Sequence, residues 1–222
     1  MGYILNIETA TKNCSVALAK NGETILCREM AEQGFSHAEK LHLFIEEIIK
    51  SAGIIFSDLS AVAVSQGPGS YTGLRIGVSA AKGLCYALEI PLISVDTLTI
   101  LANQLQIEKG IIIPMIDARR MEVYSAIFNA KKEMIREVQA EILTDSSFSD
   151  IEDAVYFVGD SNEKAKTILS KSNFNFVDTI FYPSAKEMSS ISYKKFINNS
   201  FEDVAYFEPY YLKDFMLQTK SI

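Results

Sequence analysis

Cysteine and long apolar runs are scarce in this 222-residue chain, and each scarcity excludes a class of protein. The three cysteines, Cys14, Cys27 and Cys85, are odd in number and their spacing fits no metal motif, so we expect reduced thiols. No apolar run approaches the roughly 20 residues of a membrane span, and no basic region followed by an apolar stretch opens the chain. We therefore expect a soluble, cytoplasmic protein with no membrane attachment.

Basic residues are outnumbered, with 21 Lys and Arg against 28 Asp and Glu and a net charge of -7. A protein that binds RNA by itself usually carries a basic face. On average this chain repels phosphate, so we expect any role with nucleic acid to act through a partner. A local basic patch remains compatible with this total, because net charge hides the distribution of charges.

Histidine occurs only twice, as His37 and His42, five residues apart on a predicted helix. Two helical metal ligands need a spacing of i and i+4, so these side chains point to different faces and are interpreted as solvated. The sequence also lacks a Gly-x-Ser-x-Gly elbow, a His-Glu-x-x-His motif and a Cys/His pair in a signature context. A hydrolytic site, including a metallopeptidase site, has little support.

Hydrophobic periodicity predicts an α/β order in the first half of the chain. Short apolar runs predict strands at residues 3–7, 15–18, 24–28, 59–65 and 91–95. A helix is predicted from Ser36, which forms a capping-box pattern with Glu39, to about Gly53. Further helices are expected at residues 73–88 and, capped by Asp96, at 97–105. This order mixes antiparallel hairpins with parallel crossovers.

The second half of the chain echoes the first when residue n is set against residue n+109. The matching positions are Ile4, Ile7, Glu8, Ala17 and Leu18 with Ile113, Ile116, Asp117, Ala126 and Ile127. A few matches over this length also arise by chance, but a duplication predicts two related lobes with a cleft between them. We expect lobes at residues 1–105 and 106–222, with the last residues packing back on the first lobe. The second lobe is expected to hold strands near 155–158 and 179–182, and helices near 162–170 and 185–198.

The first candidate site is the loop after the first predicted strand, with Glu8, Thr9 and Thr11. A carboxylate at a strand end followed by a turn of small residues suits a phosphate or Mg²⁺ site of the actin type. The alternative is a hairpin turn capped by Thr and Asn side chains, which the pattern alone favours.

A second candidate loop joins a predicted strand to a predicted helix and contains Gly67 and Gly69. Glycines allow close approach of the backbone, and a helix N-terminus attracts anions. The loop is neither a Walker A loop nor a dinucleotide fingerprint. The alternative is a tight turn with Ser70 or Thr72 as the N-cap.

The helix that follows carries a stripe of small residues. Glycine inside a helix costs roughly 1 kcal/mol relative to alanine, so another backbone is expected to approach closely. That backbone belongs either to the chain's own sheet or to another subunit, and the pattern favours neither.

The third candidate site is the turn with Asp117, Arg119 and Arg120. These side chains suit a phosphate or a partner carboxylate. The alternative is a charged hairpin turn that braces the lobe interface.

Four stretches of the chain resemble the TsaB (YeaZ) family: residues 7–18, 67–77, 116–124 and 208–212. The resemblance implies an α/β, actin-like (ASKHA, ribonuclease H-like) fold of two related lobes. It also implies a role in placing threonylcarbamoyl on N6 of the adenosine next to the anticodon of certain tRNAs. In that pathway a sibling, TsaD, transfers the group with the help of a metal ion, and the ATPase TsaE joins the complex.

The resemblance further implies a subunit without catalytic residues or a metal site. Positions of the metal ligands in TsaD fall here on Thr97 and Leu101, which do not hold a transition metal. The expected partners are a TsaD-like catalytic subunit, a TsaE-like ATPase and, indirectly, tRNA, with a homodimer when the chain is alone. The family's interface maps here to two helices and to these residues: Leu41, Phe44, Ile45, Ile48, Gly73, Leu74, Gly77, Ala80 and Ala81.

No cofactor is expected to be required. At most weak binding of ATP or ADP is expected at the loops with Glu8, Thr9, Thr11, Gly67, Gly69, Asp117 and Arg119. An autonomous ASKHA-type ATPase or small-molecule kinase that uses Glu8 and Asp117 remains the alternative function, and a metallopeptidase is less well supported.

Overall fold

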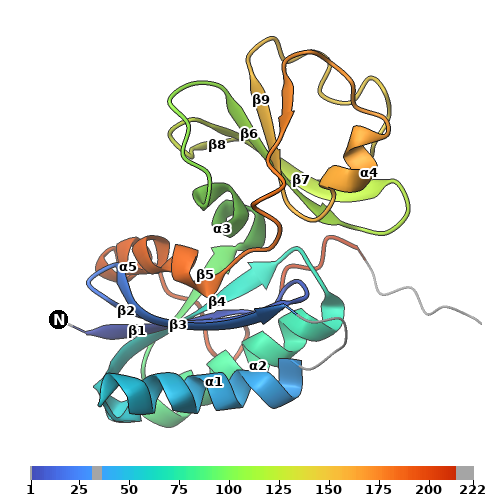
Figure 1. Ribbon diagram of the computed structural model, residues 1–222. Helices are drawn as coiled ribbons and strands as arrows, with labels where there is room; N and C mark the ends of the chain where they lie inside the picture. Colours follow the sequence, from blue (N-terminus) through green and yellow to red (C-terminus); the bar gives the residue numbers. More distant parts are fainter. Residues whose placement is uncertain (1, 32–36, 214–222) are drawn as a thin grey trace, which may run out of the picture.

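The computed structural model describes residues 2–31 and 37–213, which form two lobes, each built on a five-stranded sheet (Figure 1). The first sheet has the order β3-β2-β1-β4-β5, with β1 (Tyr3–Glu8), β2 (Asn13–Lys20), β3 (Glu23–Ala31), β4 (Leu59–Gly67) and β5 (Leu92–Asp96). The second has the order β10-β9-β6-β7-β8, with β6 (Ile111–Asp117), β7 (Glu122–Asn129), β8 (Met134–Ile142), β9 (Val155–Val158) and β10 (Phe174–Phe176).

The two sheets repeat one topology. In each, three strands form antiparallel hairpins and two further strands add in parallel beside the first. Shifting β2 by 109 residues gives 122–129, which are the bounds of β7, and the end of β1 at Glu8 falls on the end of β6 at Asp117. The predicted α/β fold of two related lobes is confirmed. The predicted division at residue 105 stays a prediction.

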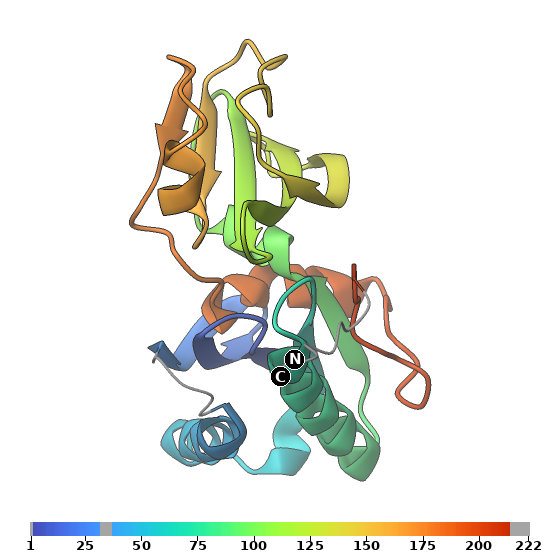
Figure 2. The same cartoon turned by 90° about the vertical axis from the view of Figure 1, so that its right-hand side faces the viewer.

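The first sheet is covered by helices on both faces. On one face lie α1 (His37–Ala52) and α2 (Tyr71–Leu88), and on the other lie the short helix η2 (Ala185–Met188) and α5 (Ser189–Ile197) (Figures 1 and 2). Because neighbouring strand residues point to opposite faces, Leu5 packs under α1 while Ile4 packs under η2. Each fully buried side chain of this size contributes roughly 1.5–3 kcal/mol.

The chain returns to the first lobe earlier than the sequence predicts. The helix expected at 185–198 exists, but it packs on the first sheet and is not part of the second lobe. Beyond it, Glu202 forms a bridge with Leu92 at the edge of β5. The apolar face that the sheet presents on this side is therefore closed by residues from the far end of the chain.

The strand predicted at residues 179–182 is wrong, since the parallel strand of this region is β10. Val177 and Ile180 instead pack at the junction of the lobes, against a cluster that includes Leu98 on α3 (Thr97–Asn103). Two predicted helices are shorter than expected: α4 covers Asn162–Lys166, and α3 ends at Asn103. The remaining helix is a single turn, η1 (Phe56–Asp58).

The interpretation of both histidines as solvated is right for His42 and wrong for His37. His37 opens α1 with 5% of its surface exposed, and its Nε2 lies 2.8 Å from the carbonyl oxygen of Thr11. The first helical turn is therefore held against the β1–β2 loop. The expected cap at Ser36 lies outside the described residues. Among the helices that the structure describes, none is long and apolar enough to cross a membrane.

Candidate functional site

The candidate loops meet where the two lobes face each other. Glu8, Gly67 and Asp96 end β1, β4 and β5, and these parallel strands bring their carboxyl ends to one edge of the sheet. Asp117 ends β6 in the second lobe, and Asp160 follows β9. Asp160 was not among the predicted site residues, although a carboxylate just past a predicted strand is the same signal that marked Glu8.

Glu8 is the most buried charged group of this edge. Its side chain is fully buried, and its Oε1 accepts a hydrogen bond of 2.5 Å from the amide of Ala10. The Thr97 hydroxyl has no hydrogen-bond partner within the described part of the chain, whereas the Ser65 hydroxyl lies close enough to Glu8 to act on its pKa. Burial raises the pKa of Glu8 to about 7, and the nearby charge of Asp96 adds to the effect.

The hydrogen bond from the Ala10 amide to Glu8 fits the hairpin-turn interpretation of Glu8, Thr9 and Thr11. Mg²⁺ binds the ionised carboxylate, so its binding would have to displace the proton that burial favours on Glu8. Within residues 2–31 and 37–213, no three His, Cys, Asp or Glu side chains come together as a metal site. The phosphate interpretation stays a prediction.

The glycine loop packs against that hairpin turn. The amide of Ser70 donates to the carbonyl oxygen of Ala10 at 2.7 Å, and the Thr9 hydroxyl donates to the carbonyl oxygen of Gly73 at 2.8 Å. A Cβ atom on Gly69 or Gly73 would collide with the backbone oxygen of Ala10 or Thr9. The close approach that the glycines indicate is thus made by the chain's own first loop.

Ser70 is the N-cap of α2, as one of the two alternatives predicts, since its hydroxyl accepts a hydrogen bond from the amide of Gly73. The amide of Leu74 is bonded to the carbonyl oxygen of Ser70. The cap engages one of the amides at the start of α2 inside the chain, and the assignment of Gly67 and Gly69 to an anion site stays a prediction.

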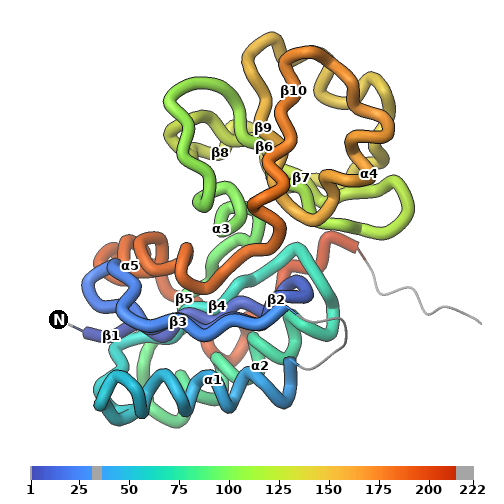
Figure 3. The backbone as a smooth tube through the Cα atoms, in the orientation of Figure 1, coloured from blue at the N-terminus to red at the C-terminus, as the bar shows by residue number. Residues whose placement is uncertain are grey.

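The last described residues lie over the glycine loop and reach the second lobe. The amide of Tyr210 donates to the carbonyl oxygen of Gln66 at 2.7 Å, and the Tyr211 ring lies 4.8 Å from the Tyr71 ring. Further on, Lys213 forms an ion pair with Glu122 at the start of β7. The backbone at the end of the described chain lies between the two lobes (Figure 3). This stretch links the lobes beside the loops that face each other.

The β6–β7 turn is held by charged contacts. Asp117 pairs with Lys164 of α4, and the amide of Asp117 donates to Asp160 at 2.8 Å. Burial raises the pKa of Asp160 to about 6, whereas the charges of Lys164 and of Lys12 from the first lobe act to lower it. These contacts fix the turn within the second lobe, and its interpretation as a brace between the lobes stays a prediction. Arg119 and its neighbour Arg120 are exposed.

The residues predicted for the partner interface need correction, because the structure buries nearly all of them inside the chain. The side chains that pack on the first sheet are Leu41, Phe44, Ile45, Ile48 and Ala81. Leu74 is buried beside Gly67. Gly73 and Gly77 are buried against Thr9, so of the predicted set only Ala80 is partly exposed. The helical period identifies an apolar face correctly, but the chain's own sheet covers that face.

The opposite face of the same helices carries a shallow groove of about 300 Å³. Ser79, Gly83 and Ala87 lie four residues apart along the exposed side of α2. A Cβ atom on Gly83 would meet nothing within 4 Å, so this helical glycine has no packing reason within the described chain. The groove residues are His42, Ile45, Glu46, Phe56, Ser79, Ala80, Gly83 and Leu84.

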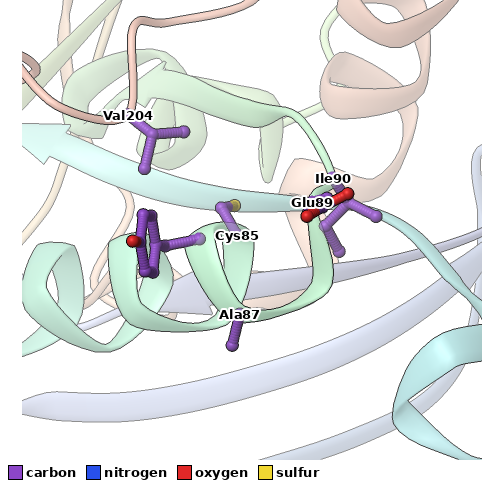
Figure 4. A pocket seen from close by; sticks show the side chains of 6 residues that line it. Cys85, Ala87, Glu89, Ile90 and Val204 are labelled. Carbon is purple, nitrogen blue, oxygen red and sulfur yellow. The ribbon is translucent and has the colours of Figure 1, made fainter.

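Large apolar side chains are exposed on the same elements or next to them: Leu43 on α1 (53%), Ile55 before η1 (65%) and Tyr86 on α2 (83%). Tyr86 borders a second hollow of about 510 Å³ at the end of α2, together with Cys85 and Val204 (Figure 4). The Cys85 thiol donates to the carbonyl oxygen of Pro91, and burial raises its pKa to about 11. Cys85 is therefore a poor nucleophile.

A family model described as TsaD: tRNA N6-adenosine threonylcarbamoyltransferase matches residues 29–218. The chain belongs to this TsaD family. It is 29% identical over 220 residues to the tRNA threonylcarbamoyladenosine biosynthesis protein TsaB of Escherichia coli K12, which covers 95% of this chain and 94% of that protein. The solved structure of YeaZ from Pseudomonas aeruginosa superposes with a TM-score of 0.81 at 25% identity, over 96% of this chain and 100% of that one.

The likeness to a catalytic member of the TsaD family is partial. The tRNA N6-adenosine threonylcarbamoyltransferase of Bacillus subtilis is 38% identical over 120 residues, which is 46% of this chain and 35% of that protein. The chain thus matches TsaB along its length and matches about a third of the transferase. The predicted resemblance to TsaB (YeaZ) and the actin-like ASKHA fold are confirmed.

Thr97 and Leu101 are the positions onto which the TsaD metal ligands were mapped. Both lie on α3 and are fully buried at the junction of the lobes, where Leu101 packs in the cluster that joins them. Neither side chain has the imidazole or carboxylate donors that transition metals prefer. In this member of the TsaD family, the two positions serve packing.

Proposed function

We propose that this chain is a non-catalytic subunit that pairs with a TsaD-like catalytic chain in the formation of tRNA threonylcarbamoyladenosine. Its near full-length relative is a tRNA threonylcarbamoyladenosine biosynthesis protein. The observation that carries the pairing is the exposed stripe of Ser79, Gly83 and Ala87 on α2. A glycine inside a helix costs about 1 kcal/mol, and nothing within the described chain offsets that cost at Gly83.

The stripe has a shape on which a helix of another subunit can pack closely. Small residues at a spacing of four leave a shallow channel along α2, and the groove between α1 and α2 continues it. Leu43 on α1 and Tyr86 on α2 are also exposed apolar side chains, and a partner that covers them would gain from their burial. When the catalytic chain is absent, the same face would support a symmetric homodimer.

The proposal assigns no catalytic residue to this chain. Glu8 has no solvent access and a pKa raised to about 7, and Asp117 is engaged by Lys164. Thr97 and Leu101 offer no metal ligand. We propose that a TsaE-like ATPase joins the pair, that no cofactor is required, and that the assembly works in the cytoplasm.

The test is the effect of filling the channel on complex formation. We expect Gly83→Leu to weaken association with a TsaD-like chain from the same source by at least about 10-fold, or about 1.4 kcal/mol. The fold is expected to survive, because leucine is a better helix former than glycine and the site is open. Size-exclusion co-elution and isothermal titration calorimetry measure the association.

Ser79→Trp should act in the same way, and Ser190→Trp provides the matched control. Ser190 is exposed on α5, on the other face of the first sheet, so its substitution should leave the complex intact. If the Gly83 and Ser79 variants bind the TsaD-like chain as tightly as the unmodified chain does, the interface lies elsewhere. If the unmodified chain does not co-elute with the TsaD-like chain, the proposed pairing is wrong.

An autonomous ATPase or small-molecule kinase is the alternative, and it requires Glu8 and Asp117 to act on a nucleotide. We expect calorimetry of the isolated chain with ATP and Mg²⁺ to show at most weak binding and no turnover. Micromolar binding with turnover would favour the alternative. Elemental analysis for zinc and iron in the purified chain tests the less supported metallopeptidase.

A further inference from the structure

Two consecutive arginines occupy an unfavourable backbone conformation at the β6–β7 turn. Arg119 and Arg120 have φ angles of 71° and 49°, in the left-handed region that glycine and asparagine normally fill. An arginine there strains the backbone, and residues held in this way concentrate at functional sites. The turn thus retains two arginines where its geometry favours smaller residues.

In the part of the chain that the structure describes, the guanidinium groups of these arginines have no side-chain partner. Within residues 2–31 and 37–213, neither side chain forms a hydrogen bond or an ion pair. The carboxylates around them are engaged elsewhere: Asp117 with Lys164, Glu122 with Lys213, and Asp160 with the amide of Asp117. The turn therefore presents uncompensated positive charge in a chain whose net charge is -7.

Further cations border the same side of the molecule. Lys12, in the β1–β2 turn of the first lobe, is exposed and close enough to Asp160 to influence that carboxyl group. Arg75 lies over the Tyr71 ring and donates to the Tyr211 hydroxyl at 3.2 Å. Residues 210–213 connect this stack to Glu122, beside the arginine turn. We call Lys12, Arg75, Arg119, Arg120 and Tyr211 the basic rim.

We propose that the basic rim binds the phosphate backbone of RNA directly. This inference rests on the proposed function, and the RNA it requires is the tRNA substrate of the complex. It replaces the expectation that tRNA contacts this chain only indirectly. Guanidinium groups present planar forks of donors that match phosphate oxygens. The neighbouring aromatic and arginine stack favours RNA over an acidic protein surface, since unpaired bases stack on such groups.

The test measures binding of tRNA to the complete complex. The unmodified chain and Arg119→Gln/Arg120→Gln are each assembled with the TsaD-like subunit and titrated into a fluorescently labelled tRNA transcript at several salt concentrations. We expect the double substitution to raise Kd about 10-fold at low salt. The slope of log Kd against log salt should fall by about 0.7–0.9 for each lost phosphate contact. Lys12→Gln should lower the slope further.

Lys109→Gln/Lys194→Gln is the control with the same change of charge. Both lysines are exposed and away from the rim, Lys109 before the start of β6 and Lys194 on α5. This control should leave both Kd and slope unchanged. A rim variant with the Kd and slope of the unmodified complex, or a control that loses as much as the rim variant, overturns the inference.

Co-elution of each variant separates the remaining outcomes. A rim variant that no longer assembles with the TsaD-like subunit overturns the RNA assignment in favour of an acidic protein surface. If the unmodified chain fails to assemble, the proposed function fails, and the inference fails with it. A rim variant that forms an intact complex but binds tRNA more weakly and with less salt dependence supports both the proposed function and the binding of RNA by the basic rim.

Discussion

At the scale of single residues, the first lobe is shaped by polar groups that the chain buries near its cleft. Glu8 has one oxygen bonded to the amide of Ala10, and its other oxygen is buried with the Ser65 hydroxyl near enough to act on it. The buried hydroxyl of Thr97 has no partner in the described part of the chain. An unpaired charge in such surroundings costs free energy, and protonation relieves the cost. Folding and pH are therefore coupled at this site.

Glu8→Gln should remove the contribution of this residue to the pH dependence of stability. The pKa of Glu8 is raised from 4.5 to about 7 on folding, so its stabilising contribution is complete below pH 4.5 and is lost as the pH rises through 7. We expect the variant to exceed the unmodified chain in free energy of unfolding at pH 8 by about 3 kcal/mol, with the difference vanishing below pH 4.5. Urea unfolding across this pH range measures it.

The comparison between variant and parent isolates Glu8, because the pKa values of Asp96 and Asp160 are also raised by burial and contribute a slope of the same sign to both proteins. Glu47→Gln, at an exposed position on α1, is the control. A difference in stability between Glu8→Gln and the unmodified chain that does not change with pH would contradict a raised pKa of Glu8.

At the scale of secondary structure, α2 uses glycine for two purposes. Gly73 and Gly77 let the helix rest on Thr9 of the first loop, so their lack of a side chain is required by contacts inside the lobe. Gly83 faces outward, where the described chain places nothing against it. One helix thus has a face that packs in the core and a face suited to a partner.

Alanine at the two kinds of glycine should change stability in opposite directions. Gly83→Ala is expected to raise the free energy of unfolding by about 0.5–1 kcal/mol through helix propensity. Gly73→Ala should lower it by about 2 kcal/mol or more, because the new Cβ atom collides with the backbone oxygen of Thr9. Denaturant midpoints measured with circular dichroism decide the matter, and changes of the same sign would refute this division of roles.

At the scale of the whole molecule, the first lobe is completed by the end of the chain. Ala185 and Met188 of η2 lie against Ile4, Ala63 and other residues of the first sheet. The hydroxyl of Ser192 on α5 donates to Asn6 on β1 at 2.7 Å, across 186 positions of sequence. The two lobes are therefore interdependent, because neither sheet receives its covering layers from one continuous half of the sequence.

A chain cut after residue 184 should lose the fold of its first lobe. Removing η2 and α5 uncovers the apolar face formed by Ile4, Ile93 and their neighbours, which the hydrophobic effect disfavours. We expect poor solubility, strong binding of a hydrophobic dye and no cooperative unfolding. A chain cut after residue 200 keeps both elements and should unfold cooperatively with reduced stability. Cooperative unfolding of the shorter chain would show that the lobe folds without its return segment.

Local patterns in the sequence determine much of this fold. The echo at n+109 sets the predicted strand 15–18 on residues 124–127, inside β7, and one of the two predicted caps, Ser70, stands at the start of α2. The glycines of the second loop correctly indicate a close approach of backbone. These features depend on residues near one another in the chain or on a repeat of the same pattern. The motifs that resemble TsaB likewise lie within short segments.

Only the tertiary structure decides which faces are free and which groups are buried. It places the apolar side of α1 and α2 in the core and leaves Gly83 outside, buries His37 and Glu8, and moves residues 185–197 to the first lobe. Each of these outcomes depends on contacts between segments that are distant in sequence, such as Thr9 with Gly73 or Ser192 with Asn6. Periodicity shows that a face is apolar, but not whether the chain itself or a partner covers it.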